Sequence, residues 1–269
     1  MKNILLLATV ALAFASCSKS DDDNNLPSSD YKLSADGLTL VQWTNSTTTT
    51  LDMQADSKLQ KVNTIGNNAF ESNQSLVSIT FPNNLKEIGA HAFEKASLSG
   101  TVTFNTMATV AFGEEAFHFS DIRKVALPNT KEIAKGMFSF CHLLKEVHFQ
   151  KVGKIDKSAF HSCFALEQVD LQATELTEIG ETAFASCREL KSITFPETLS
   201  KIGDLAFGYC SSLKTITIKA KVPPALGDTI FFGLNRGDIP NIYVPGTAVD
   251  TYKKANGWST FADKIYPIP

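Results

Sequence analysis

Hydrophobic positions in the middle of the chain recur with a period of about 23 residues. Each period is marked by a phenylalanine, usually preceded by alanine, and successive markers are 23, 24, 21, 22, 24, 23 and 24 residues apart. The markers are Phe70, Phe93, Phe117, Phe138, Phe160, Phe184, Phe207 and Phe231. Self-similarity at a fixed period is typical of repeat architectures, in which each unit stacks on its neighbours.

Other columns keep the same register as the phenylalanine. In most units an apolar residue and a glycine come shortly before the marker, as in Ile179-Gly180, and a leucine or isoleucine follows it by five or six residues. Each unit then ends with two apolar residues separated by one position, as in Ile193-Thr194-Phe195, and in three units a proline comes next. A period of two that stops at proline is typical of a short strand.

One predicted strand per unit cannot enclose a core by itself, so neighbouring units must stack strand against strand in a parallel sheet. The stretch between the glycine and the following leucine, such as residues 67–73, has the length for a short helix or turns on the other face. We therefore predict a solenoid of about seven units of 21–24 residues. Two other repeat folds are disfavoured because their units are longer: a propeller blade needs about 40 residues, and a paired-helix repeat needs about 33 or more.

Units such as IGETAFASCRELKSITFPETLSK, residues 179–201, resemble the leucine-rich repeats of the BspA-type surface proteins of Bacteroidetes. The segments 242–245 and 249–258 are also similar to the closing segment of that family. The resemblance implies a leucine-rich repeat solenoid, capped at both ends, that functions in adhesion or ligand binding. The predicted organisation is a lipoprotein signal peptide (1–16), a flexible tether (17–29), an N-terminal cap (30–64), leucine-rich repeats (65–227), and a terminal repeat with a C-terminal cap (228–269).

The start of the chain predicts its compartment. Lys2 precedes an apolar stretch at residues 4–14, and Ala15-Ser16-Cys17 follows, which is the pattern of a secretory signal. Eleven residues reach only about 16 Å, roughly half of a ~30 Å hydrocarbon core, so a spanning helix is disfavoured. The segment Phe14-Ala15-Ser16-Cys17 resembles the bacterial lipobox, which implies lipid attachment at Cys17. An ordinary signal peptide with a chance cysteine is the alternative.

The polar run after Cys17 predicts a tether. It contains three consecutive aspartates, at residues 21–23, and cannot bury enough apolar surface to order itself. Ser20 with these aspartates is similar to the export signal of Bacteroidetes lipoproteins, which implies an outer-membrane lipoprotein exposed at the cell surface. A calcium loop is disfavoured because the central glycine and closing glutamate of such loops are missing.

Charge and composition exclude one class of partner. The chain has 25 basic and 28 acidic side chains, for a net charge of −3, so a nucleic-acid surface is not expected. Phenylalanine dominates the aromatic residues, 19 against 5 tyrosines and 2 tryptophans, and this bias indicates packing more than recognition.

Four cysteines form a column in successive units, three residues after each marker: Cys141, Cys163, Cys187 and Cys210. Stacked rungs keep parallel Cβ atoms about 4.8 Å apart, whereas a disulfide requires about 3.8 Å, so buried free thiols are predicted. A zinc site formed by Cys141, His142, His161 and Cys163 has suitable ligand types, but the histidines lie at different offsets. His91, His118 and His148 share no column, and we predict no metal site and no cofactor.

The sequence does not predict an enzyme. On the strand face, the repeat register places His148 beside Asp170 and Asp170 beside Thr194, with the acid in the middle, whereas a nucleophilic triad needs the base there. Motifs for phosphate binding, for a nucleophilic serine or for a catalytic zinc do not occur. No catalytic residue is assigned.

Polar and charged residues repeat rung by rung on the predicted strand face. The candidate binding residues are Arg123, Lys124, Lys145, His148, Glu167, Asp170, Lys191 and Lys214. An extended, preformed polar surface of this kind fits a protein ligand, either host matrix or bacterial surface, or a glycan. The alternatives are an accessory glycan-binding or docking subunit of an outer-membrane uptake system, and a merely solvated sheet face without a ligand.

Overall fold

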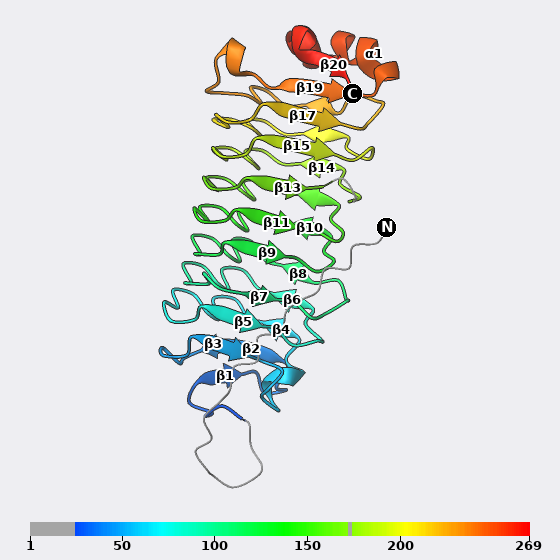
Figure 1. Cartoon of the computed structure of the whole chain (residues 1–269). Coiled ribbons are helices and arrows are strands. Elements are labelled where there is room, and N and C mark those ends of the chain that lie inside the picture. The colour runs from blue at the N-terminus through cyan, green and yellow to red at the C-terminus, as the bar shows by residue number, and fades with distance from the viewer. Residues whose placement is uncertain (1–24, 172–173) are drawn as a thin grey trace, which may run out of the picture.

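The computed structural model describes residues 25–171 and 174–269, which form an elongated stack of rungs (Figure 1). The chain is a parallel β-solenoid of about ten turns, which confirms the predicted fold. The predicted signal peptide and Cys17 lie outside the described residues. Two residues of the predicted tether contact the first rungs: the Asn25 side-chain oxygen accepts a hydrogen bond from the amide of Ser57, and the amide of Leu26 donates one to the carboxylate of Asp56.

The strand face contains the strands predicted from the period of two. It is built from β3 (Thr50–Asp52), β5 (Ser78–Thr80), β7 (Val102–Thr103), β9 (Lys124–Ala126), β11 (Glu146–His148), β13 (Gln168–Asp170), β15 (Ser192–Phe195), β17 (Thr215–Ile218), β19 (Asn241–Val244) and β20 (Ile265–Pro267). Equivalent residues pair between rungs, as in Val147 with Val169, so the repeat register predicted from the sequence is correct.

A second set of strands lies on the opposite face, where the sequence predicts only a short helix or turns. It comprises β1 (Tyr31–Leu33), β2 (Thr39–Trp43), β4 (Thr64–Ile65), β6 (Glu87–Ile88), β8 (Ala111–Phe112), β10 (Glu132–Ile133), β12 (Lys154–Ile155), β14 (Glu178–Ile179), β16 (Lys201–Ile202) and β18 (Ala225–Leu226). Most have only two residues, one buried and one at the surface. Two residues are too few for an alternating pattern, which is why only the buried column is visible in the sequence.

The solenoid has more rungs than the seven units predicted from the marker column. Strands β2 and β3, within the predicted N-terminal cap, pair in parallel with β4 and β5 and so begin the stack. At the other end, β19 and β20 pair in parallel and extend it. Neither end segment repeats the Ala-Phe marker, so the marker column alone underestimates the number of rungs.

Both faces are interrupted near the same place. The strand-face sheet divides between β7 and β9, and the opposite sheet divides between β8 and β10. The strand pattern of the unit that contains Phe93 is also the least regular in the sequence, with Val102 and Phe104 in place of the usual pair. The irregular unit therefore marks a seam in the solenoid.

The segments predicted as short helices or turns are pairs of turns. In every unit the residues two before and two after the marker have positive φ, for example Thr182 (54°) and Ser186 (63°) around Phe184. A left-handed conformation costs about 1–2 kcal/mol for a residue with a side chain. It is offset here by hydrogen bonds along the solenoid, because Thr182, Phe184 and Ser186 donate their amide N–H groups to carbonyls of the next rung. We call the surface of these turn segments the turn side.

The phenylalanine column forms a continuous stack through the core. Phe138 and Phe160 are 5.4 Å apart between ring centroids, with an interplanar angle of 11°, and Phe184 and Phe207 are 5.7 Å apart at 3°. Trp43 extends the stack beyond Phe70. This arrangement confirms that consecutive units share one hydrophobic interior.

The glycine before the marker is required by close contact between rungs. A Cβ atom at Gly180 would lie 2.5 Å from the amide nitrogen of Lys157 in the preceding rung. Side chains do not make contacts this short, so alanine at this position would push two rungs apart.

The C-terminal segment contains the helices α1 (Val249–Lys254), η3 (Gly246–Ala248) and η4 (Trp258–Lys264), and two further short 3₁₀ helices are η1 (Leu59–Lys61) and η2 (Arg236–Asp238). The buried side chains of Tyr252 and Trp258 donate hydrogen bonds to the carbonyls of Ala220 and Pro224. These contacts fit the C-terminal cap, which stays a prediction. Among the described residues, no helix combines the length and apolar character needed to cross a bilayer.

Candidate binding surfaces

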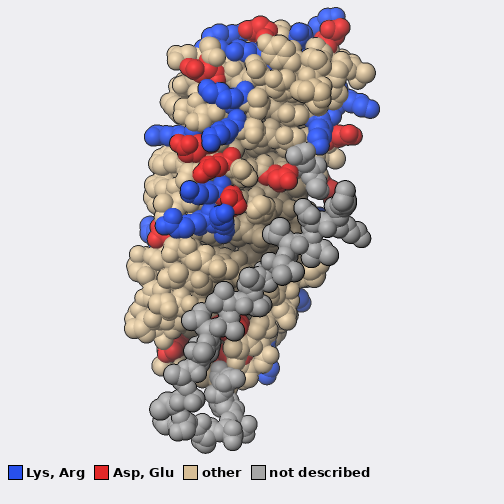
Figure 2. Space-filling view, viewed as in Figure 1, with Lys and Arg blue, Asp and Glu red and all other residues tan. Residues whose placement is uncertain are grey.

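The candidate residues predicted on the strand face lie on consecutive rungs. All are exposed except Glu167, which is partly buried. Charged side chains gather over the upper, C-terminal part of this face, whereas the part over β3, β5 and β7 carries few (Figure 2). The structure therefore brings the predicted residues together on one half of the face.

Several of these charges are paired between neighbouring rungs. The Nζ atom of Lys124 lies 2.8 Å from Oε1 of Glu146, and that of Lys145 lies 3.6 Å from Oε1 of Glu167. The hydrogen bond from Lys124, with a contribution from His148, lowers the pKa of the Glu146 carboxyl. Arg123, Lys191 and Lys214 have no carboxylate within ion-pair distance among the described residues. These three cations, together with Lys145, whose ion pair is the longer of the two, are the ones that the face offers to a ligand.

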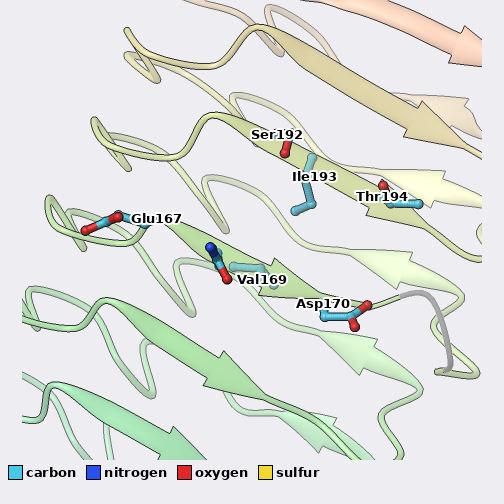
Figure 3. Close-up of a pocket in the computed structure, with 7 residues that line it drawn as sticks. Glu167, Val169, Asp170, Ser192, Ile193 and Thr194 are labelled. Atoms are coloured by element: carbon cyan, nitrogen blue, oxygen red, sulfur yellow. The ribbon is translucent and has the colours of Figure 1, made fainter. Parts of the chain in front are cut away.

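A shallow depression lies between β13 and β15 on this face (Figure 3). It has a volume of about 240 Å³, and its polar lining includes Glu167, Asp170, Ser192 and Thr194. His148 pairs with Asp170, and Asp170 pairs with Thr194, so the acid occupies the middle position as predicted. The order of these groups does not match a nucleophilic triad.

A wider depression of about 480 Å³ lies at the seam. It is lined by Val102, Val125 and Ala126, with Arg123 and His148 at its polar part. This depression joins the seam to the charged half of the strand face.

Aromatic residues that the sequence-based prediction did not include line the edge where the turn side meets the strand face. Phe119 stacks on Phe140 with ring centroids 4.7 Å apart, and His142 stacks on Phe164 at 4.6 Å. The guanidinium carbon of Arg188 lies 4.6 Å from the centroid of the Phe164 ring. We call these five residues the aromatic edge.

The aromatic edge continues toward the C-terminus with exposed rings, since Tyr209 is 51% and Phe232 is 50% exposed. A signal for it is present in the sequence: in five successive units, from that of Phe117 to that of Phe207, the residue two or four positions after the marker is aromatic, histidine or arginine. Interpreting the phenylalanine bias as packing alone overlooks these outer rings.

The cysteine column is buried and consists of free thiols, as predicted. Each Sγ contacts a carbonyl oxygen of the preceding rung, for example Cys141 with Phe117 at 2.9 Å and Cys163 with Phe138 at 3.0 Å. Burial raises the pKa of the Cys141 and Cys210 thiols to about 12. The thiols therefore stay protonated near neutral pH and are poor nucleophiles.

His142 and His161 do not join Cys141 and Cys163 in a common site. His142 stacks on Phe164, and His161 lies against the edge of Phe140. Burial lowers the pKa of His161, which keeps this imidazole neutral. Both imidazoles pack against phenylalanine rings, and this arrangement is consistent with the prediction that the two cysteines and two histidines do not form a zinc site.

A stack of rungs with charged and aromatic rows on its surface is a repeat scaffold, an architecture compatible with protein binding. Residues 52–167 and 110–236 match the BspA type leucine rich repeat region, in six copies. The chain belongs to this BspA-type leucine-rich repeat family. Leucine-rich repeat proteins are generally binding scaffolds, and no catalytic family is indicated.

Solved bacterial structures are similar to this chain. A leucine-rich repeat protein from Bacteroides ovatus ATCC 8483 is similar with a TM-score of 0.50 and 19% identity, over 78% of this chain and 62% of that chain. A leucine rich cell surface protein from Faecalibacterium prausnitzii A2-165 has a TM-score of 0.43 and 19% identity, over 78% of this chain and 74% of that chain.

The pneumococcal vaccine antigen PcpA has a TM-score of 0.40 and 19% identity, over 81% of this chain and 65% of that chain. This chain spans about 62% of the length of the Bacteroides ovatus protein. Among curated proteins, none matches the chain.

Proposed function

We propose that the chain is a lipid-anchored protein of the cell surface that binds a protein partner on a host or a neighbouring bacterium and so mediates adhesion. The anchor is Cys17, and the resemblance of its surroundings to a lipobox supports this assignment. Membership of the BspA-type leucine-rich repeat family suggests surface localisation, which agrees with display on the outer membrane.

The observation that carries the proposal is the aromatic edge beside the charged half of the strand face. Residues that dominate the binding energy of protein interfaces are enriched in tyrosine, tryptophan and arginine, and interfaces are also enriched in phenylalanine. Arg188 over Phe164 supplies such an anchor, and Arg123, Lys145 and Lys191 supply charges that attract and orient a partner. A strand face without aromatic residues beside it would offer only its charges.

The binding test uses purified chain on an array of immobilised host matrix proteins and bacterial surface proteins. We expect saturable binding to at least one protein, and we expect it to weaken with salt because exposed charges are screened. Combined substitution of Arg123, Lys145 and Lys191 by alanine should weaken binding about tenfold or more, mostly through slower association. Phe164→Ala should weaken it through faster dissociation.

Lys201→Ala is the matched control, because Lys201 is an exposed lysine of β16 on the opposite face. This variant should bind as the original chain does. An equal loss of binding affinity in the Lys201→Ala variant and in the triple variant would contradict the assignment of the strand face as the binding surface.

The polar depression between β13 and β15 favours a second candidate function, glycan capture by an accessory subunit of an uptake system. Carboxylates and hydroxyls such as those of Asp170, Ser192 and Thr194 suit the hydroxyl groups of a sugar chain. Glycan capture predicts that polysaccharide raises the melting temperature, and that Asp170→Asn with Thr194→Val removes this shift. A chain that binds proteins but shows no shift with polysaccharide would exclude this candidate.

Surface display is tested separately from binding. Protease treatment of intact cells should release fragments of the repeats, and Cys17→Ala should prevent lipid labelling of the chain. If treatment of intact cells releases nothing while lysed cells yield fragments, the protein faces the periplasm.

A further inference from the structure

Two histidines and two glutamates converge on the turn side, next to the aromatic edge, whose Phe119 and Phe140 rings meet the His118 ring edge-on. They come from the same two positions of two successive units: His91 and Glu115 lie two residues before the marker, and Glu94 and His118 follow it directly. The two segments read His-Ala-Phe-Glu and Glu-Ala-Phe-His, so the order of ligand types is reversed between the units. Stacking in register then places each histidine against a carboxylate of the other unit.

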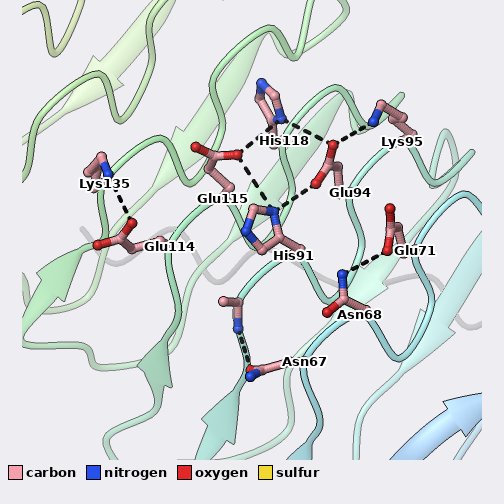
Figure 4. Close-up of polar contacts among 11 residues, drawn as sticks. Asn67, Asn68, Glu71, His91, Glu94, Lys95, Glu114, Glu115, His118 and Lys135 are labelled. Carbon is pink, nitrogen blue, oxygen red and sulfur yellow. Dashed lines mark hydrogen bonds and ion pairs between the residues drawn. The ribbon is translucent and has the colours of Figure 1, made fainter.

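The side-chain atoms form a closed ring of contacts (Figure 4). Nδ1 of His91 lies 2.7 Å from Oε2 of Glu94 and 3.6 Å from Oε2 of Glu115. Nδ1 of His118 lies 3.6 Å from Oε1 of Glu94 and 3.5 Å from Oε2 of Glu115. Tetrahedral zinc with bonds of 2.0–2.2 Å keeps its ligand atoms about 3.4 Å apart. Three of the four contacts have nearly this spacing, and one ligand atom from each of His91, Glu94 and Glu115 lies within 4.8 Å of the other two. His118 approaches this group through its contacts with the two glutamates.

One side of the ring is buried, which distinguishes it from an ordinary surface ion pair, whereas the side chains of His91 and Glu115 are 38% and 33% exposed. The side chains of Glu94 and His118 are only 12% and 17% exposed. Nδ1 of His118 is also one of three buried side-chain nitrogens in the described part of the chain without a hydrogen-bond partner. A buried nitrogen without a partner destabilises the fold, and a ligated cation would satisfy it.

A lysine already neutralises part of the negative charge. Nζ of Lys95 lies 2.6 Å from Oε1 of Glu94, but the Lys95 side chain is 54% exposed and extends from the rim of the ring. With neutral imidazoles, the two glutamates and this lysine leave one negative charge. Lys95 therefore competes for one carboxylate oxygen, while Glu115 and both histidines remain to hold a cation.

We propose that His91, Glu94, Glu115 and His118 form a binding site for a divalent transition-metal ion, best matched by Zn²⁺. Nitrogen ligands from histidine and oxygen ligands from glutamate suit Zn²⁺, and both ring nitrogens of histidine serve as ligands in proteins. Ligation by all four side chains would leave no open position on the ion, which makes the proposed site structural and not catalytic.

The proposed site lies at the seam of the solenoid, where a bound ion would link two units. It joins the units that contain Phe93 and Phe117, whose strands β7 and β9 belong to separate sheets. Backbone hydrogen bonds of the turn segments hold these units together, for example Phe93 to Ala116. A bound ion would add a cross-link at the seam and couple the N-terminal rungs to the rest of the solenoid.

The test measures Zn²⁺ binding by the purified chain after removal of metal with EDTA, by calorimetry at pH 7.5 and by the melting temperature. We expect one ion per chain and a higher melting temperature, since a ligand that binds only the folded state stabilises it. Co²⁺ should give the visible absorption of a tetrahedral site. Glu115→Gln, which keeps the shape of the side chain, and His118→Gln should each weaken binding about tenfold or more.

Glu114→Gln is the matched control, because Glu114 is the neighbour of Glu115 and pairs with Lys135 outside the ring (Figure 4). It should bind Zn²⁺ as the original chain does. Lys95→Ala should bind more tightly, because it removes the competing ammonium group. The proposal is overturned if the original chain shows neither heat nor a melting shift with Zn²⁺, or if Glu115→Gln and His118→Gln both retain full affinity.

Discussion

The turn side and the strand face are built from the same repeat but by different rules. On the strand face, equivalent residues lie above one another, so that Glu146 pairs with Gln168 in the next rung and their side chains remain in parallel columns. On the turn side, the residues two before and two after each marker have positive φ, and side chains from different columns meet, as His91 and Glu94 do. The outer side chains of the strand face therefore form parallel rows, whereas side chains of the turn side form local clusters.

The two regions also differ in how they support the fold. The segments that form the turn side also contribute the stacked phenylalanines of the core, the glycines in contact with the preceding rung, and the buried thiols. The strand face contributes a sheet whose outer side chains are exposed to solvent. We therefore expect stability to depend mostly on the turn side, and substitutions on the strand face to leave the fold intact and change binding alone.

The largest expected effect is that of Phe184→Ala. Its ring is fully buried between Phe160 and Phe207, and truncation of a buried phenylalanine destabilises by about 3–5 kcal/mol. Phe164→Ala, on the aromatic edge, should cost less than about 1 kcal/mol because its ring is partly exposed. Urea unfolding of both variants measures the difference. Similar losses in the two would contradict the assignment of the core column.

Gly180→Ala tests the contact between rungs on the turn side. The added methyl group would meet the backbone of Lys157, and overpacking of this kind typically destabilises by about 1–3 kcal/mol. Gly237→Ala is the control, since no atom lies within 4 Å of the methyl group that it would add. Thermal and urea unfolding should separate the two variants. If Gly180→Ala is as stable as the original chain, the rungs are less tightly packed than their spacing indicates.

The cysteine column predicts a loss of stability at high pH. Burial holds the pKa of Cys141 at about 12 in the folded state, above the value of 9.0 expected for an exposed thiol. The unfolded chain therefore loses protons first, and stability should fall as pH rises above about 9, by up to roughly 1.4 kcal/mol per pH unit for each thiol. Urea unfolding between pH 8 and pH 10.5 measures this slope, and Cys141→Ala should reduce it. An equal slope in both proteins would show that Cys141 does not titrate in this way.

The sequence is sufficient to predict the positions that are structurally equivalent in every unit. Phe138 and Phe160 are stacked, and His148 lies beside Asp170, because strict spacing fixes which residues become neighbours. The backbone of the turn segments could not be predicted in the same way. Phe140 and Leu205 adopt left-handed φ values that bulky side chains rarely take, and only hydrogen bonds between rungs make this possible.

The cluster around His91 is hidden in the sequence for a related reason. A search for histidines that share a column does not find it, because His91 and His118 occupy different columns. The two histidines are joined through Glu94 and Glu115, since each imidazole contacts both carboxylates, and the spacing within one unit does not show this. Aligning His-Ala-Phe-Glu with Glu-Ala-Phe-His, one unit apart, is the signal that points to it. The aromatic edge could also be predicted from the sequence, by considering that some phenylalanines lie at the surface and not in the core.

The smallest expected effect on stability is on the strand face. Lys124 lowers the pKa of Glu146 in the folded state, so this pair stabilises the chain above the usual carboxyl range, and the stabilisation is lost as pH falls through the lowered pKa. Exposed pairs of this kind contribute little, and we expect Glu146→Gln to leave the melting temperature at pH 7 almost unchanged. Between pH 5 and pH 3 the original chain should lose slightly more stability than this variant, as measured by melting in low salt. A large loss at pH 7 would show that the strand face supports the fold, and the distinction between a stabilising turn side and a displayed strand face would then fail.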